Sequence, residues 1–227
     1  MLFRSEAVAH AAGRERLEAR VTTRMSGFSV SCAVFQKAGF APPRLGLVNL
    51  TGEVGPMSSC VFPRDWRAVL RRTVDPRSYD FPAWGPFDAG EAADLEGLRA
   101  QPAYHAGFDF AHLGDRIDPV CSLKILRHGR LVGWIVAEPL SNALAAEFPE
   151  RVCRHYVSAY LDEALWHTGV MLAGYWHAFS RQAAAYGEGS IANYFSNMPR
   201  QMALSRRRFA PMALHYDEIH VLEKALG

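Results

Sequence analysis

The stretch Val170-Met-Leu-Ala-Gly-Tyr-Trp-His-Ala-Phe-Ser-Arg-Gln-Ala-Ala-Ala-Tyr186 decides the fold, because the sequence takes on a clear helical period there. Its larger apolar side chains form one stripe, made up of Leu172, Trp176, Phe179, Ala183 and Tyr186. Such a stripe predicts one long amphipathic helix, which ends before Gly187. The flanking segments 152–161 and 190–196 interleave apolar and small residues, and this pattern favours strands.

Shorter segments extend this pattern in both directions. The clearest is a hairpin, in which strands at 120–126 and 131–138 flank a turn that contains Gly129. Further strands are expected at 44–50 and 211–222, and further helices at 63–73, 90–101 and 199–208. Helices that alternate with strands in this order predict an α/β (α+β) fold, with a mixed central β-sheet flanked by helices.

The N-terminal part of the chain has a different pattern. Residues 1–20 carry charges at helical spacing and predict a short surface helix, whereas 20–36 alternates apolar with small polar residues and predicts a strand or hairpin. Gly39 and Pro42 end this part. We therefore expect an N-terminal extension over 1–40, which adds an extra strand pair, and one domain over 41–227.

Composition argues against several classes of protein. The chain has 227 residues, of which 49% are hydrophobic and 21% charged, as in ordinary globular proteins. A net charge of +2 is too small to create an electrostatic field that attracts nucleic acid. The longest run without charged residues, 164–180, is shorter than the roughly 20 apolar residues that a membrane span needs. The four cysteines form no CxxC pair and the nine histidines no HExxH motif, so we expect no metal site and a cytoplasmic location.

The order of these elements, together with Gly169 and the closing helix from Asn197 to Phe209, resembles the GNAT superfamily of acyltransferases over residues 44–222. In that family the loop before the long central helix binds the pyrophosphate of the acyl donor, through a helix N-terminus and a glycine that permits close approach. The family pattern is Arg or Gln, two variable residues, Gly, one variable residue, and Gly or Ala. The aligned stretch Trp166-His-Thr-Gly-Val-Met171 shares only Gly169 with it.

The resemblance implies a set of donor-binding residues. They are Trp166, His167, Thr168, Gly169, Val170 and Met171 at the start of the central helix, with Asn197 and Arg200 after the following strand. Structural alternatives stay open: Gly169 packs a helix against a strand, Asn197 caps a helix, and Arg200 belongs to a solvated helix face. The implied donor is acyl-CoA or an acyl-phosphopantetheine on an acyl carrier protein, and Arg200 with the run 206–208 suits either partner.

The resemblance also implies where the reaction takes place. Family members hold the pantetheine arm of the donor between two strands that splay apart, which correspond here to 152–161 and 190–196. The helix after the second strand lacks the tyrosine that often serves as the family's acid. Candidate bases and acids near the two strands are Asp162, Glu163, His155, Tyr194 and Ser196. Structural roles stay open here too, because Asp162 and Glu163 suit a helix N-terminus and His155 suits a core.

The resemblance therefore implies an enzyme that transfers an acyl group from a thioester donor to an amine of a small molecule or peptide, with loop 80–90 lining the acceptor pocket. Such an enzyme holds the reactants in line and stabilises the oxyanion with a strand N–H. One alternative is a non-catalytic GNAT-like binding module. Another is a subunit of a larger assembly, which forms a homodimer through 20–36.

Overall fold

A computed structural model describes residues 15–23, 28–61, 65–141, 143–197, 202–203 and 205–226. The chain divides into two compact units. The larger unit comprises Thr51–Tyr194 and Pro211–Leu214, and the smaller unit comprises Met1–Leu50, Phe195–Ala210 and His215–Gly227. The domain boundary expected between residues 40 and 41 stays a prediction.

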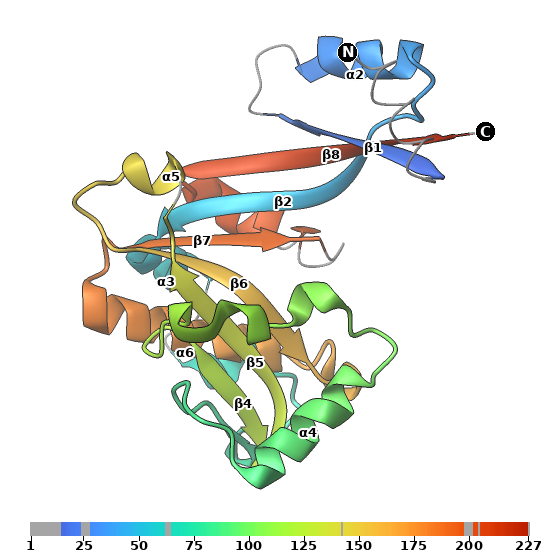
Figure 1. The fold of residues 1–227 in the computed structure, drawn as a ribbon. Helices are drawn as coiled ribbons and strands as arrows, with labels where there is room; N and C mark the ends of the chain where they lie inside the picture. Colours follow the sequence, from blue (N-terminus) through green and yellow to red (C-terminus); the bar gives the residue numbers. More distant parts are fainter. Residues whose placement is uncertain are drawn as a thin grey trace. The chain divides into compact units, whose positions relative to one another are not determined.

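The larger unit is built on a sheet whose strands lie in the order β7, β6, β5, β4 and β3 (Figure 1). Their bounds are β3 Tyr79–Asp80, β4 Leu123–Arg127, β5 Arg130–Pro139, β6 Cys153–Leu161 and β7 Ile191–Ser196, and the last two residues of β7 belong to the smaller unit. Neighbours from β3 to β6 are antiparallel, whereas β6 and β7 are parallel. The predicted hairpin, the strands on either side of the long helix and the mixed sheet are thus confirmed.

Helices cover both faces of this sheet (Figure 1). Their bounds are α3 Val54–Val61, η1 Trp66–Val69, α4 Ala89–Arg99, η3 Ala106–Phe108, η4 Ala111–Arg116 and α6 Val170–Tyr186, where η marks a 3-10 turn. On one face α3 and η1 contact α6, and α6 approaches β5 so closely that a Cβ on Gly174 would lie 2.9 Å from Ile135 Cδ1. On the other face α4, η3 and η4 share an apolar core with Trp134 and Val136. Adjacent residues of β5 thus serve opposite faces, as strand geometry requires.

Local signals set the ends of the two long helices. α4 begins with a capping box, in which the Asp88 carboxylate accepts the Glu91 N–H at 2.7 Å and the Glu91 carboxylate accepts the Asp88 N–H at 3.1 Å. α6 lies between Gly169 and Gly187, whose φ values of 90° and 86° favour glycine. Both helices, expected at 90–101 and 170–186, are confirmed.

The smaller unit contains the neighbouring strands β1, β8 and β2, in that order, and the helix α2. Their bounds are β1 Arg16–Thr22, α2 Phe28–Lys37, β2 Arg44–Glu53 and β8 His215–Ala225, and the last three residues of β2 belong to the larger unit. β1 runs antiparallel to β8. Val21, Cys32, Phe40 and Leu222 form a hydrophobic core cluster in this unit. The strand expected at 44–50 is confirmed.

The strand or hairpin predicted over 20–36 is wrong in its second half. β1 ends at Thr22 and pairs with β8, while the segment that follows from residue 28 is helical. That segment carries two periods at once, because Phe28, Cys32 and Phe35 also recur at helical spacing. Those three side chains pack into the core, whereas the alternating residues Val30 and Val34 are 66% and 50% exposed. Core packing therefore selects the helical period.

Three further elements differ from expectation. The helix predicted over 1–20 is wrong for residues 16–20, which lie in β1, and 1–14 lie outside the described residues. Within the described part of the helix predicted over 63–73, which begins at residue 65, only η1 is helical, because Leu70 adopts extended backbone with ψ 148°. Of the helix predicted over 199–208, residues 202–203 are α-helical and Ser205–Phe209 form a π turn, while 198–201 and 204 lie outside the described residues.

The last strand begins later than expected, at His215, because 210–212 form a 3-10 turn that contains Pro211. Among the residues that the structure describes, no helix is long and apolar enough to cross a membrane.

Candidate functional site

β6 and β7 pair along only part of β6. Their parallel register begins at Cys153 with Ile191 and ends at Tyr156 with Tyr194. β6 then continues to Leu161, and its register with β5 continues with it. The parallel ladder therefore stops well before β6 does, and we call its end, at Tyr156 and Tyr194, the splay.

A β-bulge lies at the same point of β6. Val136 pairs with Ser158 and Ala137 pairs with Tyr156, so Val157 is an extra residue in β6. A bulge bends its strand and takes the extra residue out of the ladder. Because the bulge directly follows the last residue paired with β7, the bend of β6 accounts for the splay.

Three tyrosines surround the splay on the face that α6 covers. The Tyr175 ring, from α6, lies 6.0 Å from that of Tyr156 and 6.3 Å from that of Tyr194, measured between ring centroids. The Tyr156 hydroxyl donates to the Gln182 side chain at 2.8 Å. Burial raises the pKa of Tyr156 and of Tyr175, so both hydroxyls stay protonated at neutral pH. They are hydrogen-bond donors rather than bases.

A row of polar side chains crosses the opposite face of the sheet beside the splay. Glu138 of β5, His155 of β6 and Asn193 of β7 occupy adjacent register positions. His155 Nδ1 lies 3.8 Å from one Glu138 carboxylate oxygen, and an Arg116 nitrogen lies 3.1 Å from the other. Asn193 Nδ2 donates to Thr51 Oγ1 at 2.8 Å, and both of these residues are buried.

His155 supplies the imidazole of this row. Burial lowers the pKa of His155 below its ordinary value, although the Glu138 carboxylate acts in the opposite direction. The imidazole is therefore neutral at neutral pH and can accept a proton. Glu138 lies close enough to stabilise the imidazolium that would result.

Asp162 and Glu163 have structural partners. Asp162 caps the turn η5, Glu163–Leu165, by accepting the Ala164 N–H at 2.9 Å. A Glu163 carboxylate oxygen accepts the Ala103 N–H at 2.7 Å. Both residues follow the end of β6, roughly 20 Å along an extended strand from His155. The structure therefore does not bring these carboxylates together with His155.

The loop before α6 packs against η1. A Cβ on Gly169 would lie 2.2 Å from the Val69 carbonyl oxygen, and the φ of Gly169 is +90°. The neighbouring Thr168 carbonyl accepts the Arg71 N–H at 2.9 Å. Glycine is therefore required at position 169 by the fold itself. The Val69 carbonyl also brings a partial negative charge to the N-terminal end of α6.

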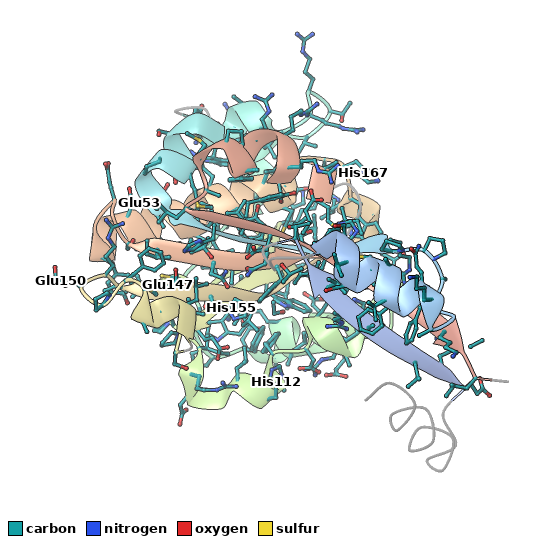
Figure 2. The ribbon with its side chains drawn as sticks, turned by 90° about the horizontal axis from the view of Figure 1, so that it is seen from above. Glu53, His112, Glu147, Glu150, His155 and His167 are labelled. Carbon is teal, nitrogen blue, oxygen red and sulfur yellow. The ribbon has the colours of Figure 1, made fainter. Side chains whose placement is uncertain are left out.

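The other residues of this loop have varied surroundings. The Trp166 indole N–H donates to the Leu161 carbonyl at 2.8 Å, so Trp166 ties the loop to the end of β6. His167 is exposed and has a φ of +71°, Val170 is fully buried, and Met171 is half-buried. Figure 2 shows His167 and His155 well apart.

The candidates at and after the last residue of β7 belong to the smaller unit. Ser196, at the end of β7, is 4% exposed, and Asn197 is exposed. Arg200 lies outside the described residues.

An apolar groove lies beside the aromatic, proline-rich loop that follows β3. It is lined by Trp84, Gly85, Pro86, Phe87, Phe110, Ala111, Gly114, Ile117 and Pro119. Lys124, which is 5% exposed, fixes this loop, since its Nζ donates to the Pro86 carbonyl at 2.7 Å and to the Glu91 carboxylate at 2.5 Å. The side chains that line the groove carry no charge. The hydrogen bonds of Lys124 fix the position of the loop that forms one side of the groove.

Two side chains connect the groove to β6. The rings of Phe110 and Trp134 lie 5.3 Å apart, and the Trp134 indole N–H donates to Ser158 Oγ at 3.0 Å. Ser158 directly follows the bulge residue. The groove thus lies behind the part of β6 that runs beyond the splay.

Sequence patterns missed Val157, Tyr175 and Asn193. A bulge depends on the register with a partner strand, so Val157 carries no local signal. Tyr175 lies next to the apolar stripe of its helix and is easily taken for core. Asn193 did carry a signal, because a polar side chain inside the apolar run 191–195 needs a buried partner. No cluster of three or more His, Cys, Asp or Glu suited to a metal occurs among the described residues.

Comparison with solved structures finds GCN5-related N-acetyltransferases. A tandem GNAT protein from the clavulanic acid biosynthesis pathway matches with a TM-score of 0.59 and 13% identity, over 99% of this chain and 68% of its own. GCN5-related N-acetyltransferases from Kribbella flavida and Sphaerobacter thermophilus match with TM-scores of 0.52 and 0.51 and identities of 12% and 15%. These matches cover 98% and 93% of this chain, and 73% and 60% of the two proteins.

No protein-family model and no curated protein matches the sequence. The structural similarities confirm the GNAT fold that the resemblance implied. At such low identity they establish the fold, and the reaction has to be argued from the residues of this chain.

Proposed function

We propose that the chain is an N-acyltransferase that binds an acyl thioester at the splay. The observation that carries the proposal is the coincidence of the splay with the bulge at Val157. Where two parallel strands part, their backbone N–H and C=O groups become available to an extended, amide-containing chain such as the pantetheine arm. The GNAT fold supports the proposal, because the neighbours named above are N-acetyltransferases.

The Val157 N–H is suited to stabilise the oxyanion of the reaction. When an amine attacks the thioester carbonyl, the carbonyl oxygen takes up negative charge, and a fixed N–H lowers the energy of that state. The tetrahedral intermediate then collapses: the C–S bond breaks, the sulfur leaves as thiolate, and the new amide nitrogen gives up a proton. A bulge residue has its N–H outside the regular ladder, as this role requires.

His155 is the proposed base, because it is neutral at neutral pH and has a carboxylate 3.8 Å from Nδ1. On the other face, the hydroxyls of Tyr175 and Tyr194 are the proposed hydrogen-bond donors to the departing thiolate. Since burial raises the pKa of Tyr175, we expect this hydroxyl to donate a hydrogen bond rather than a proton. Asp162 keeps its capping role, and Glu163 keeps its hydrogen bond to the Ala103 N–H.

The donor is an acyl-phosphopantetheine, carried either by coenzyme A or by a carrier protein. The N-terminus of α6 suits the diphosphate of coenzyme A, and the proposed contacts are residues 166–171. The Val69 carbonyl beside Gly169 opposes an anion there. An acyl carrier protein would need no diphosphate site. The thiol-release experiment below therefore compares acyl-CoA and acylated carrier protein as donors.

The acceptor is an amine with an apolar part, since the groove at loop 81–88 offers aromatic rings and no charge. Aromatic and aliphatic groups are the ligands that such a groove binds best.

Thiol release tests the proposal. The protein is mixed with acetyl-CoA and longer acyl-CoAs in one arm and with acylated carrier protein in the other, each with a panel of apolar amines, and free thiol is followed with a chromogenic disulfide. We expect amine-dependent release with one donor and the matching amide by mass spectrometry. Neither release nor thermal stabilisation by any donor would refute the proposal.

The second candidate function is a binding module without catalysis. The contact of Val69 with Gly169 favours it, because it explains the glycine without a donor. Stabilisation by a donor without amine-dependent thiol release would support this candidate.

A further inference from the structure

β1 is the edge strand of its sheet among the strands that the structure describes. An edge strand presents a row of backbone N–H and C=O groups that can pair with another strand. The backbone hydrogen bonds to β8 show which residues of β1 direct their N–H and C=O groups toward the edge of the sheet. The Thr23 N–H donates to the Glu218 carbonyl and the Leu226 N–H donates to the Glu15 carbonyl, so odd-numbered residues bond to β8.

The uniform antiparallel register of β1 with β8 extends this rule along the strand. Hydrogen-bonded positions recur at every second residue of an antiparallel ladder. The backbone groups directed away from β8 are therefore those of Arg16, Glu18 and Arg20. Their side chains share the exposed face, while those of Leu17, Ala19 and Val21 share the face that α2 covers.

We propose that two copies of this chain associate through β1, antiparallel and about a two-fold axis at Ala19. In this register Glu18 of each copy lies opposite Arg20 of the other, and Arg16 lies opposite Thr22. Leu17 meets Val21 on the covered face, at positions where side chains approach most closely. The outward backbone groups of Glu18 and Arg20 each pair with those of the other copy.

The charged side chains of β1 favour this register over the two registers in which the two-fold axis lies one residue away. If the axis moves to Glu18, then Glu18 faces Glu18 and Arg16 faces Arg20. If it moves to Arg20, two arginines meet at the axis. Like charges directly opposite each other destabilise a strand pair, whereas opposite charges stabilise it. The charges that protect an edge from random pairing thus permit one specific pairing.

The occupant is a second copy because the complementary strand is β1 itself. A two-fold interface needs a surface that is complementary to itself. β1 has this property about Ala19, because Glu18 and Arg20 lie on either side of Ala19 and carry opposite charges. Glu18 and Arg20 already form an exposed ion pair within one chain, 2.6 Å between Arg20 Nε and the carboxylate. Exchange of that pair between copies costs little, because such exposed pairs are weak.

Charge reversal tests the register. Glu18→Arg places two like-charged pairs across the axis, and so does Arg20→Glu, so each single variant should weaken the dimer by about tenfold in sedimentation velocity. Mixing the two variants should restore association as a heterodimer, visible by native mass spectrometry, and the double variant should dimerise as the unchanged chain does. Arg77→Glu, an exposed charge reversal in η2 (Pro76–Ser78), is the control and should have no effect.

A backbone variant gives an independent check. Proline is tolerated in an edge strand where its nitrogen faces outward, so Arg20→Pro should keep the β1–β8 pair, judged by amide exchange in β8, and abolish association. A chain that stays monomeric at all soluble concentrations would overturn the proposal. So would a dimer whose association the single reversals leave unchanged, or variants that fail to form the heterodimer.

Discussion

His155 lies where burial and a carboxylate compete for its proton. Because burial prevails and lowers the pKa of His155, we expect activity to be constant at neutral pH and to fall only as the pH drops through a value below about 6.5. Replacing the base by His155→Gln should lower kcat by about 10²-fold to 10⁴-fold and remove this acid limb. The measurement is the pH profile of thiol release.

His112→Gln is the matched control for this substitution, because His112 is exposed on η4. It should leave both kcat and the pH profile unchanged. An acid limb that persists in the His155→Gln variant would exclude His155 as the base.

Gly169 tests the structural reason for a glycine at the start of α6. An alanine there would clash with the Val69 carbonyl oxygen and would have to adopt a φ of +90°. Gly169→Ala should therefore lower the free energy of unfolding by about 3 kcal/mol. The measurement is urea unfolding. Gly97→Ala in α4 is the control: no atom lies within 4 Å of its added Cβ, and it should stabilise the helix by about 1 kcal/mol. Equal effects of the two substitutions would contradict this account.

At the scale of elements, the ion pair of Lys124 and Glu91 joins β4, α4 and the groove loop. Lys124→Met leaves the Glu91 carboxylate with little solvent and without its cation, and should cost about 3–5 kcal/mol of unfolding free energy. Glu91→Gln keeps an acceptor for the capping box, so adding it to Lys124→Met should recover at least half of that loss. Additive effects in thermal unfolding would show that the pair is not coupled.

The groove itself is probed by Gly85→Leu. No atom lies within 4 Å of a Cβ at Gly85, so the new side chain enters open space and should fill the groove without unfolding the chain. We expect the KM for an apolar amine to rise about tenfold or more while the KM for the donor is unchanged. Gly97→Leu, at an open position in α4 outside the groove lining, should change neither value. A donor KM that rises instead would place the acyl chain, not the acceptor, in the groove.

Elements with one clear period were predictable from the sequence, and elements shaped by distant partners were not. The stripe of α6, bounded by Gly169 and Gly187, sets its ends locally. In α2 both periods are present, and only the core around Leu222 decides between them. The loop before α6 was correctly placed in the sequence, but its neighbour Val69 is far away along the chain. The bulge at Val157 arises from register, which no local pattern encodes.

At the scale of the whole molecule, the two units differ in how the chain builds them. The larger unit is nearly one continuous segment, Thr51–Tyr194, whereas the smaller unit draws on three segments and pairs Thr22 with Ile219. A contact so distant in sequence forms only when both ends of the chain are present. The smaller unit should therefore depend on β8, while the larger unit carries its own core.

A chain shortened after Leu214, which lacks β8, separates these cases. We expect α2 and β1 to lose their protection against amide hydrogen exchange, because the core residue Leu222 and the partner of β1 are both gone. β4, β5 and β6 should keep theirs, since their ladders and the apolar cluster around Trp134 lie within Thr51–Tyr194. Protection that persists in α2 would mean that its core forms without β8, and loss of protection in β5 would mean that the larger unit does not hold its structure by itself.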